Sequence, residues 1–184
     1  ILNLFERTNI EASSSGSINA SGVRWQRYNL DHRYSRKRRV ISMTADENGA
    51  IISEIEPNYR TWGDPAATEE QRRVSRDPLS NVVAMAIDVG RSRRCEGTYP
   101  TFDGRFHYLL QLSDGDIDDY EGGGYEGQVL KCKLAYIAVS GFNPRDQGRR
   151  RVPEGQIWFA LMADTTFAPP VRISTPLSPG GATI

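Results

Sequence analysis

The residues around Cys132 place the strongest constraint on the fold of this chain. Apolar and polar residues alternate from residue 128 to residue 136, which is the period of a β-strand with one buried face. Cys132 falls on the apolar face, and Cys95 is the only other cysteine. Two isolated cysteines of this kind favour a structural disulfide over a metal site or a redox motif. The pair therefore predicts a strand cross-linked to a distant segment, and an oxidising compartment.

A free, reactive Cys95 is the alternative to this pairing. Arg93 and Arg94 precede it, and neighbouring positive charges favour the thiolate of an unpaired cysteine. Pairing with Cys132 is the preferred interpretation, because a thiol on the apolar face of an exported strand is normally oxidised to its partner. The bond would stabilise the fold by about 4 kcal/mol in the chain-entropy model.

Several other stretches have the composition or the alternation of β-strands. They are residues 23–30, 40–45, 50–55, 98–102, 105–112, 128–139 and 156–162. Asn48-Gly49 and Asp103-Gly104 are the turns of two predicted hairpins. In the second hairpin Tyr108 shares a face with other apolar residues, and His107 faces the other way.

One helix is predicted over residues 78–89. Asp77 is a suitable N-cap, Pro78 suits the first helical position and Gly90 supplies a C-terminal stop. Residues 1–24 are expected to form a turn between short strands, and residues 59–73 and 113–127 to form loops. The tail from residue 168 to residue 184 has four prolines and is expected to hold at most one edge strand.

Many strands and one helix predict a mainly β protein. We expect a long curved antiparallel sheet that forms an open or spiral β-barrel, with the helix packed on its concave side. The 184 residues fit a single β-rich domain, and no apolar run is long enough to span a membrane. The start at Ile1 is expected if a signal peptide, and with it any preceding strand, has been removed.

Short motifs occur in a recognisable order between residues 77 and 142. They are Asp77-Pro78-Leu79-Ser80, Cys95, Phe102-Asp103-Gly104-Arg105 with Tyr108 and Leu110, Cys132, and Gly141-Phe142. This order resembles the bacterial periplasmic family catalogued as domain of unknown function 3108. The resemblance implies export to the periplasm of Gram-negative bacteria, a paired cysteine and a β-rich open-barrel or spiral fold, and it implies no established activity. Where that family has further basic residues after the Asp-Gly-Arg turn, this chain has Phe106 and His107.

The charged residues argue against nucleic acid as a partner. Lys+Arg and Asp+Glu are equal at 23 each, so the chain has no overall positive field. Two basic clusters stand out, at residues 36–39 and at residues 149–151. They could bind lipid phosphates, lipopolysaccharide or peptidoglycan carboxylates if the fold brings them together, and solvated turns are the alternative.

Two further candidates for chemistry are weaker. Asp114, Asp116 and Asp118 alternate as in a calcium loop, but the sixth and twelfth positions of an EF-hand are occupied by Asp119 and Tyr125. A solvated acidic loop is therefore preferred. His107 is a poor catalytic candidate. Asp103, four residues earlier on the same strand face, is too far away for the hydrogen bond of a catalytic triad. The sequence has no phosphate-loop, dinucleotide or nucleophile-elbow motif, so no cofactor is predicted and an enzyme is not favoured.

Aromatic residues on the concave side could line a groove for an apolar ligand, or could simply be core. They are Trp25, Tyr108, Tyr136, Trp158 and Phe159. The leading hypothesis is a monomeric, non-enzymatic periplasmic protein that supports the cell envelope by binding a protein, lipid or glycan. A carrier of a lipid or another apolar ligand is the first alternative, and a hydrolase is the second.

Overall fold

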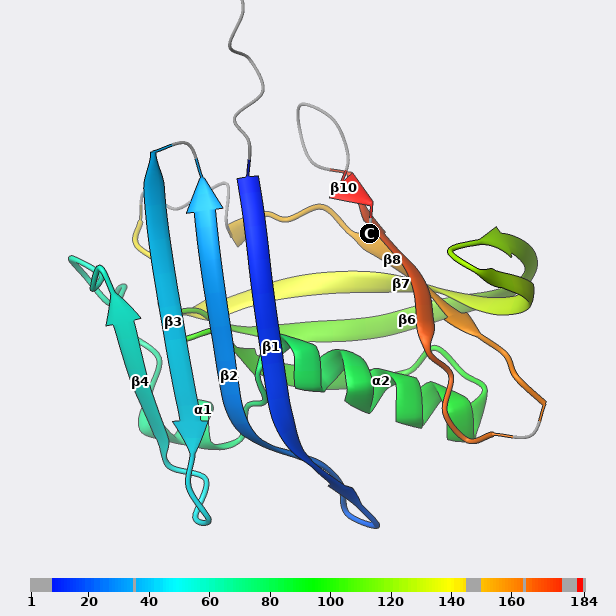
Figure 1. The fold of residues 1–184 in the computed structure, drawn as a ribbon, viewed down its shortest axis with the longest axis horizontal. Helices are drawn as coiled ribbons and strands as arrows, with labels where there is room; N and C mark the ends of the chain where they lie inside the picture. Colours follow the sequence, from blue (N-terminus) through cyan, green and yellow to red (C-terminus); the bar gives the residue numbers. More distant parts are fainter. Residues whose placement is uncertain (1–7, 35, 145–149, 164, 177–181, 184) are drawn as a thin grey trace, which may run out of the picture.

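The strands form two antiparallel sheets in the computed structural model, which describes residues 8–34, 36–144, 150–163, 165–176 and 182–183 (Figure 1). The first sheet has the order β1-β2-β3-β4, with β1 (Thr8–Asn19), β2 (Gly22–Tyr34), β3 (Lys37–Ala45) and β4 (Ile51–Glu56). The second has the order β10-β9-β8-β7-β6-β5, with β5 (Gly97–Phe102), β6 (His107–Gly122), β7 (Tyr125–Ser140), β8 (Gly155–Ala160), β9 (Pro170–Thr175) and β10 (Ala182–Thr183).

The predicted mainly β class is confirmed, although the strands are divided between two sheets. Within the described ranges they form no closed barrel. The chain leaves the first sheet after β4, passes through the helices α1 (Glu69–Arg73) and α2 (Pro78–Ser92), and enters the second sheet at β5. Each group of consecutive strands therefore pairs within itself.

The helix α2 lies between the two sheets (Figure 1). Its side chains Met85 and Val89 are fully buried and belong to one cluster with Leu130 and Phe159 of the six-stranded sheet. Leu79, at the start of the helix, packs instead on the core of the four-stranded sheet. The apolar stripe of α2 thus joins the two sheets, and its burial is the main packing contribution of the helix.

The ends of α2 show why it occupies its observed length. The carboxylate of Asp77 accepts hydrogen bonds from the backbone N–H groups of Leu79 and Ser80, both at 3.0 Å, so the predicted N-cap is confirmed. The helix continues past the predicted stop at Gly90 and ends at Arg93, which has φ 55°. A Cβ on Gly90 would lie 2.2 Å from the carbonyl oxygen of Thr166, so this glycine permits close packing rather than termination.

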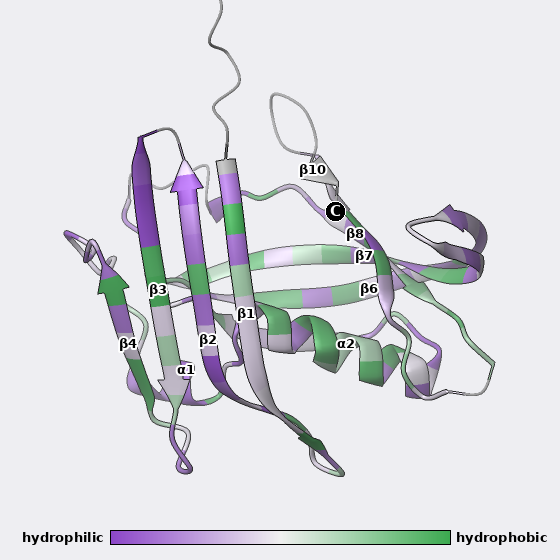
Figure 2. Cartoon of the chain, in the orientation of Figure 1, coloured by the Kyte–Doolittle hydropathy of each residue, from purple (hydrophilic) through white to green (hydrophobic). Residues whose placement is uncertain are grey.

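A second cluster fills the space between the four-stranded sheet and the start of the other sheet. Tyr28 of β2 pairs in register with Met43 of β3, and both side chains face inward. Phe102 at the end of β5 packs into the same cluster, together with Trp25 and Ile41. In Figure 2 hydrophobic and hydrophilic residues are interspersed along β2 and β4, whereas β3 starts with a continuous hydrophilic block and has hydrophobic residues only beyond it.

The acidic segment predicted as a loop is a β-ribbon. Strand β6 continues to Gly122, and β7 begins at Tyr125 after a turn in which Gly123 and Gly124 have φ 58° and 80°. Two glycines with positive φ form the tight turn that joins antiparallel strands. Cross-strand pairing therefore outweighs the low β-propensity of the acidic residues, and the loop prediction was wrong here.

Three other local predictions were wrong. The N-terminal segment forms the long strand β1, paired with β2, instead of a turn between short strands. The segment expected to be a loop contains α1, whose capping box links Thr68 and Gln71. The C-terminal tail holds two strands, because β9 pairs with both β8 and β10. In each case pairing with a distant segment, or a side-chain cap, supplies hydrogen bonds that composition alone does not show.

Candidate functional site

The turn between β5 and β6 builds the core of the candidate site. The carboxylate of Asp103 accepts hydrogen bonds from the backbone N–H groups of Arg105 and Phe106, at 3.0 and 2.8 Å. Gly104 has φ 103°, and a Cβ there would lie 2.8 Å from a methyl group of Ile41. Asp103-Gly104-Arg105 therefore folds into a tight turn against β3. The turn holds Arg105 between the two sheets.

Arg105 is a buried cation, with only 7% of its surface exposed. Its guanidinium carbon lies 4.8 Å from the centre of the Tyr59 ring and 4.8 Å from that of Phe106. The guanidinium of Arg39, from β3, lies 4.0 Å from the centre of the same Tyr59 ring. Tyr59, on the segment between β4 and α1, thus brings two positive charges together, and cation–π attraction offsets part of their desolvation.

Tyr59 is a neutral phenol at neutral pH. Burial raises the pKa of its hydroxyl above the usual value, and the nearby carboxylate of Asp103 acts in the same direction. The hydrogen bond from Arg39 and the charges of Arg39 and Arg105 partly oppose this rise. The hydroxyl therefore remains available as a hydrogen-bond donor and acceptor beside the two guanidinium groups.

These residues form one wall of a pocket with a volume of about 840 Å³. All of its charged lining residues are basic: Lys37, Arg38, Arg39, Arg60 and Arg105. The tyrosines Tyr34 and Tyr59 line it as well. Figure 2 shows that the end of the β2–β3 hairpin, where Lys37 begins β3, is strongly hydrophilic. We call this hollow the basic pocket; its composition suits an anion.

Arg38 is paired with a carboxylate of the first sheet. Arg38 donates from Nε and Nη2 to Asp31, at 2.9 and 2.8 Å, and Arg33 donates to the same carboxylate at 2.9 Å. The hydrogen bonds from Arg38, followed by those from Arg33, hold the pKa of the Asp31 carboxyl well below its usual range. Arg39 differs, because its Nε is buried without a hydrogen-bond partner among the described residues.

The second basic cluster reaches the same region through Arg150. Its guanidinium lies 5.8 Å from the ring centre of Phe142, which stacks on Phe106 at 4.5 Å. Phe106 in turn lies beneath Arg105. Arg150 thus approaches the rings beneath Arg105 but does not line the basic pocket. Arg149 lies outside the described residues.

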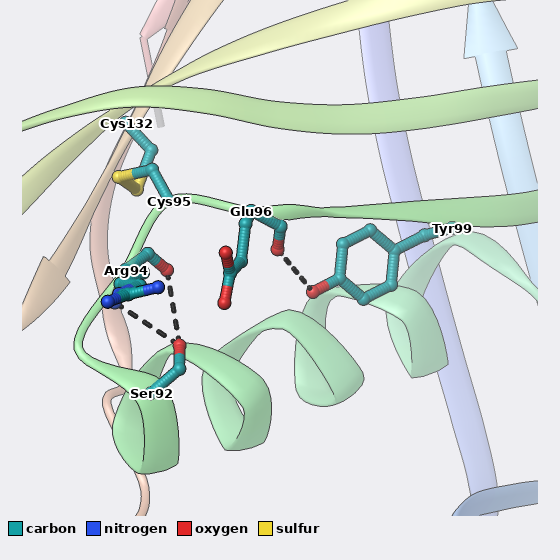
Figure 3. The surroundings of a disulfide bond; sticks show 6 residues. All are labelled: Ser92, Arg94, Cys95, Glu96, Tyr99 and Cys132. Carbon is teal, nitrogen blue, oxygen red and sulfur yellow. Dashed lines mark hydrogen bonds between the residues drawn. A yellow bond between two sulfur atoms is a disulfide. The ribbon is translucent and has the colours of Figure 1, made fainter.

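The predicted disulfide between Cys95 and Cys132 is confirmed, with a Cα–Cα distance of 5.4 Å (Figure 3). It joins the segment after α2 to β7. Near it, the backbone N–H of Arg94 donates to the Ser92 hydroxyl at 3.2 Å, and Tyr99 donates to the carbonyl of Glu96 at 3.4 Å. The disulfide is separate from the basic pocket.

The aromatic residues proposed for a groove lie apart. Trp25 belongs to the cluster beneath the four-stranded sheet, and its indole donates to the carbonyl of Ser75 at 3.1 Å. Tyr136 stacks on the buried Tyr108 with ring centres 4.5 Å apart. Trp158, on β8, instead has two cations close to its ring. The ammonium nitrogen of Lys131 lies 5.5 Å, and the guanidinium carbon of Arg172 4.9 Å, from the ring centre. Phe159 is fully buried in the core cluster of α2. The fold therefore does not gather the five proposed groove residues around one hollow.

The calcium candidates do not converge either. Asp116 and Asp118 lie along β6, where side chains two residues apart are roughly 7 Å apart. Asp114 accepts a hydrogen bond from Lys133 at 2.8 Å instead. The part of the chain that the structure describes has no group of three or more His, Cys, Asp or Glu side chains suited to a metal ion.

His107 is buried, with 5% of its surface exposed, and lies outside the lining of the basic pocket. Neither ring nitrogen has a hydrogen-bond partner within the described ranges. Burial lowers the pKa of the imidazole, which favours its neutral form. The side chain thus has the surroundings of a core residue.

Tyr59 and Arg60 were not predicted as site residues, because the segment of residues 59–73 was expected to form a loop. Their role depends on the approach of that segment to β3 and to the β5–β6 turn. A weak signal was present, since Tyr59, Arg60 and Trp62 form a cluster of aromatic and basic residues within a short stretch.

Comparison with family models, with curated proteins and with solved structures returned no match for this chain. Among the described residues, no helix is long and apolar enough to cross a membrane. The features of this chain that bear on its function are the basic pocket, the disulfide and the order of the motifs between residues 77 and 142.

Proposed function

We propose that this protein is a non-enzymatic binding protein that recognises a phosphate-bearing component of the bacterial cell envelope. The observation that carries the proposal is the basic pocket, in which every charged lining residue is a cation and two guanidinium groups flank Tyr59. Arginine binds phosphate with directed, charge-assisted hydrogen bonds. A doubly charged phosphate fits such a cluster better than a single carboxylate does.

Export to the periplasm is part of the proposal. The disulfide between Cys95 and Cys132 supports it, because such bonds persist in oxidising compartments. The resemblance to the periplasmic family supports the same location and a role in the envelope. Arg105 links this resemblance to the binding function, since it belongs to the Phe102-Asp103-Gly104-Arg105 motif and lines the basic pocket.

The two alternative functions receive less support. A hydrolase that uses His107 would need that side chain in a polar cleft, and it is buried outside the pocket lining. A carrier for a purely apolar ligand receives less support because the aromatic residues expected to line its groove, Trp25, Tyr136 and Trp158, lie in separate surroundings.

Calorimetric titration of inorganic phosphate into the Arg39→Gln variant tests the proposal. Removing one charged donor should weaken binding by about tenfold to a hundredfold, because a hydrogen bond to a charged group contributes roughly 1.5–3 kcal/mol. Arg36→Gln is the matched control: Arg36 belongs to the same basic run but lies outside the pocket lining, so its affinity should stay within about twofold of wild type.

Binding should also weaken as sodium chloride is raised, because salt screens the attraction between the cations and phosphate. Equal losses in both variants would point to a diffuse surface charge and contradict the pocket. A wild-type protein that fails to bind phosphate would contradict the proposal directly.

A further inference from the structure

A second hollow adjoins the basic pocket and shares Arg105 with it. It has a volume of about 290 Å³ and lies next to the segment that carries Tyr59. The ring of Tyr59, which lines the basic pocket, meets the ring of Trp62, which lines the second hollow, edge to face with centres 5.8 Å apart. A ligand held by the basic pocket could therefore extend past Arg105 into this neighbouring cavity.

The lining of the second hollow is mixed. Trp62, Ala67 and Phe102 supply apolar surface, whereas Ser53 and Arg72 supply polar groups beside Arg105. The Ser53 hydroxyl oxygen and the Nε of Arg72 are buried without hydrogen-bond partners among the described residues. Buried polar atoms are normally hydrogen-bonded, so Ser53 and Arg72 bring hydrogen-bonding capacity to this lining that the described residues do not use.

A sugar ring fits this combination better than an alkyl chain does. The C–H face of a pyranose can pack against an aromatic ring, and its hydroxyl groups can bond to a guanidinium and a serine. An alkyl chain offers no hydrogen bond to the serine or to the guanidinium groups of this lining. At about 30 Å³ for each water molecule, the hollow has room for roughly ten water-sized groups, enough for a hexose.

We infer that the natural ligand is a glycosyl phosphate, with its phosphate in the basic pocket and its sugar ring in the second hollow beside Trp62. This inference rests on the proposed function for the phosphate, and adds the sugar. Arg105 lies at the junction of the two parts of the ligand. Because Trp62 is 42% exposed, it can contact a ligand entering from solvent.

Titration of three probes separates the parts of the inference: inorganic phosphate, glucose 1-phosphate and octyl phosphate. Glucose 1-phosphate should bind about tenfold or more tightly than inorganic phosphate, because the ring adds contacts in the second hollow. It should also change the tryptophan fluorescence, since Trp62 is far more exposed than Trp25 or Trp158.

The Trp62→Ala variant should lose this preference for glucose 1-phosphate over inorganic phosphate. Phe167→Ala is the matched control: Phe167 is an exposed aromatic residue, 38% accessible, outside both linings, and its removal should leave the preference unchanged. Arg72→Gln should also reduce the preference for glucose 1-phosphate.

Equal affinities for inorganic phosphate and glucose 1-phosphate would overturn the sugar subsite and leave the phosphate-binding function standing. Tighter binding of octyl phosphate than of glucose 1-phosphate, with a dependence on Trp62, would overturn it in favour of a lipid. If none of the three probes binds, both the subsite and the proposed function are wrong.

Discussion

Arg105 has the most informative surroundings of any single residue discussed above, because it is a buried cation. A buried guanidinium is costly unless other groups compensate its charge. Two aromatic rings, of Tyr59 and Phe106, lie close to it, and the Asp103 carboxylate orders the turn on which it stands. This arrangement holds a positive charge at the wall of a pocket, where its attraction for an anion is less screened than it would be on an open surface.

His107 gives a prediction at the same scale. Its folded pKa lies below the usual 6.5 because of burial, so below pH 6.5 the unfolded chain takes up a proton that the native side chain does not. The neutral imidazole therefore leaves the free energy of unfolding at its full value above about pH 6.5. That free energy decreases as the pH falls from about 6.5 towards the folded pKa. Urea unfolding of wild type and of His107→Leu at several pH values measures this.

The His107→Leu variant should lose the part of the pH dependence that lies just below pH 6.5, and its stability at pH 7.5 should stay within about 1 kcal/mol of wild type, since both ring nitrogens lack partners. An unchanged pH profile in His107→Leu would show that the native imidazole titrates normally.

At the scale of elements, the N-terminus of α2 joins the helix to the first sheet. The Asp77 carboxylate accepts from two backbone N–H groups of the helix and also from the hydroxyl of Ser14 on β1, at 2.9 Å. The side chain is fully buried. Asp77 therefore caps α2 and fixes the position of β1 on it, which gives a structural reason for this residue in the motif.

Asp77→Ala should destabilise the protein by about 2 kcal/mol, since a lost cap costs roughly 0.5–2 kcal/mol and the Ser14 hydroxyl loses a partner. Asp77→Asn keeps one acceptor oxygen and should cost less. Thr68→Ala removes the corresponding cap of the short, exposed α1 and should cost less than Asp77→Ala. Chemical denaturation ranks the three variants; equal effects at Asp77 and Thr68 would contradict the joining role.

At the scale of the whole molecule, the disulfide ties the exit of α2 to the middle of the six-stranded sheet. Gly115, opposite Cys132 in the strand register, makes room for it, because a Cβ there would lie 2.6 Å from the sulfur of Cys95. The glycine sits at a β-bulge in β6. The cross-link and the bulge thus belong to one packing arrangement.

Reducing the disulfide should lower the free energy of unfolding by about 4 kcal/mol, because the bond closes a loop with a sequence separation of 37 residues. Urea unfolding with and without reductant measures the loss. A variant with both Cys95 and Cys132 replaced by Ala is the control, and reductant should leave its midpoint unchanged. A loss below about 1 kcal/mol would mean that the reduced, unfolded chain stays compact.

The elements with local signals could be predicted from the chain's own residue pattern. The alternation around Cys132 and the Asp77-Pro78 start of α2 were predicted correctly, and the turn was predicted at Asp103-Gly104, although it extends to residue 106 before β6 begins at His107. Which distant segments meet depends on long-range packing. Arg39, Tyr59 and Arg105 come from three separate parts of the chain, and nothing in their local sequence states that two guanidinium groups share one ring. The strands, the turn and the cap follow from short-range patterns, whereas the pocket follows from long-range packing of two sheets around one helix.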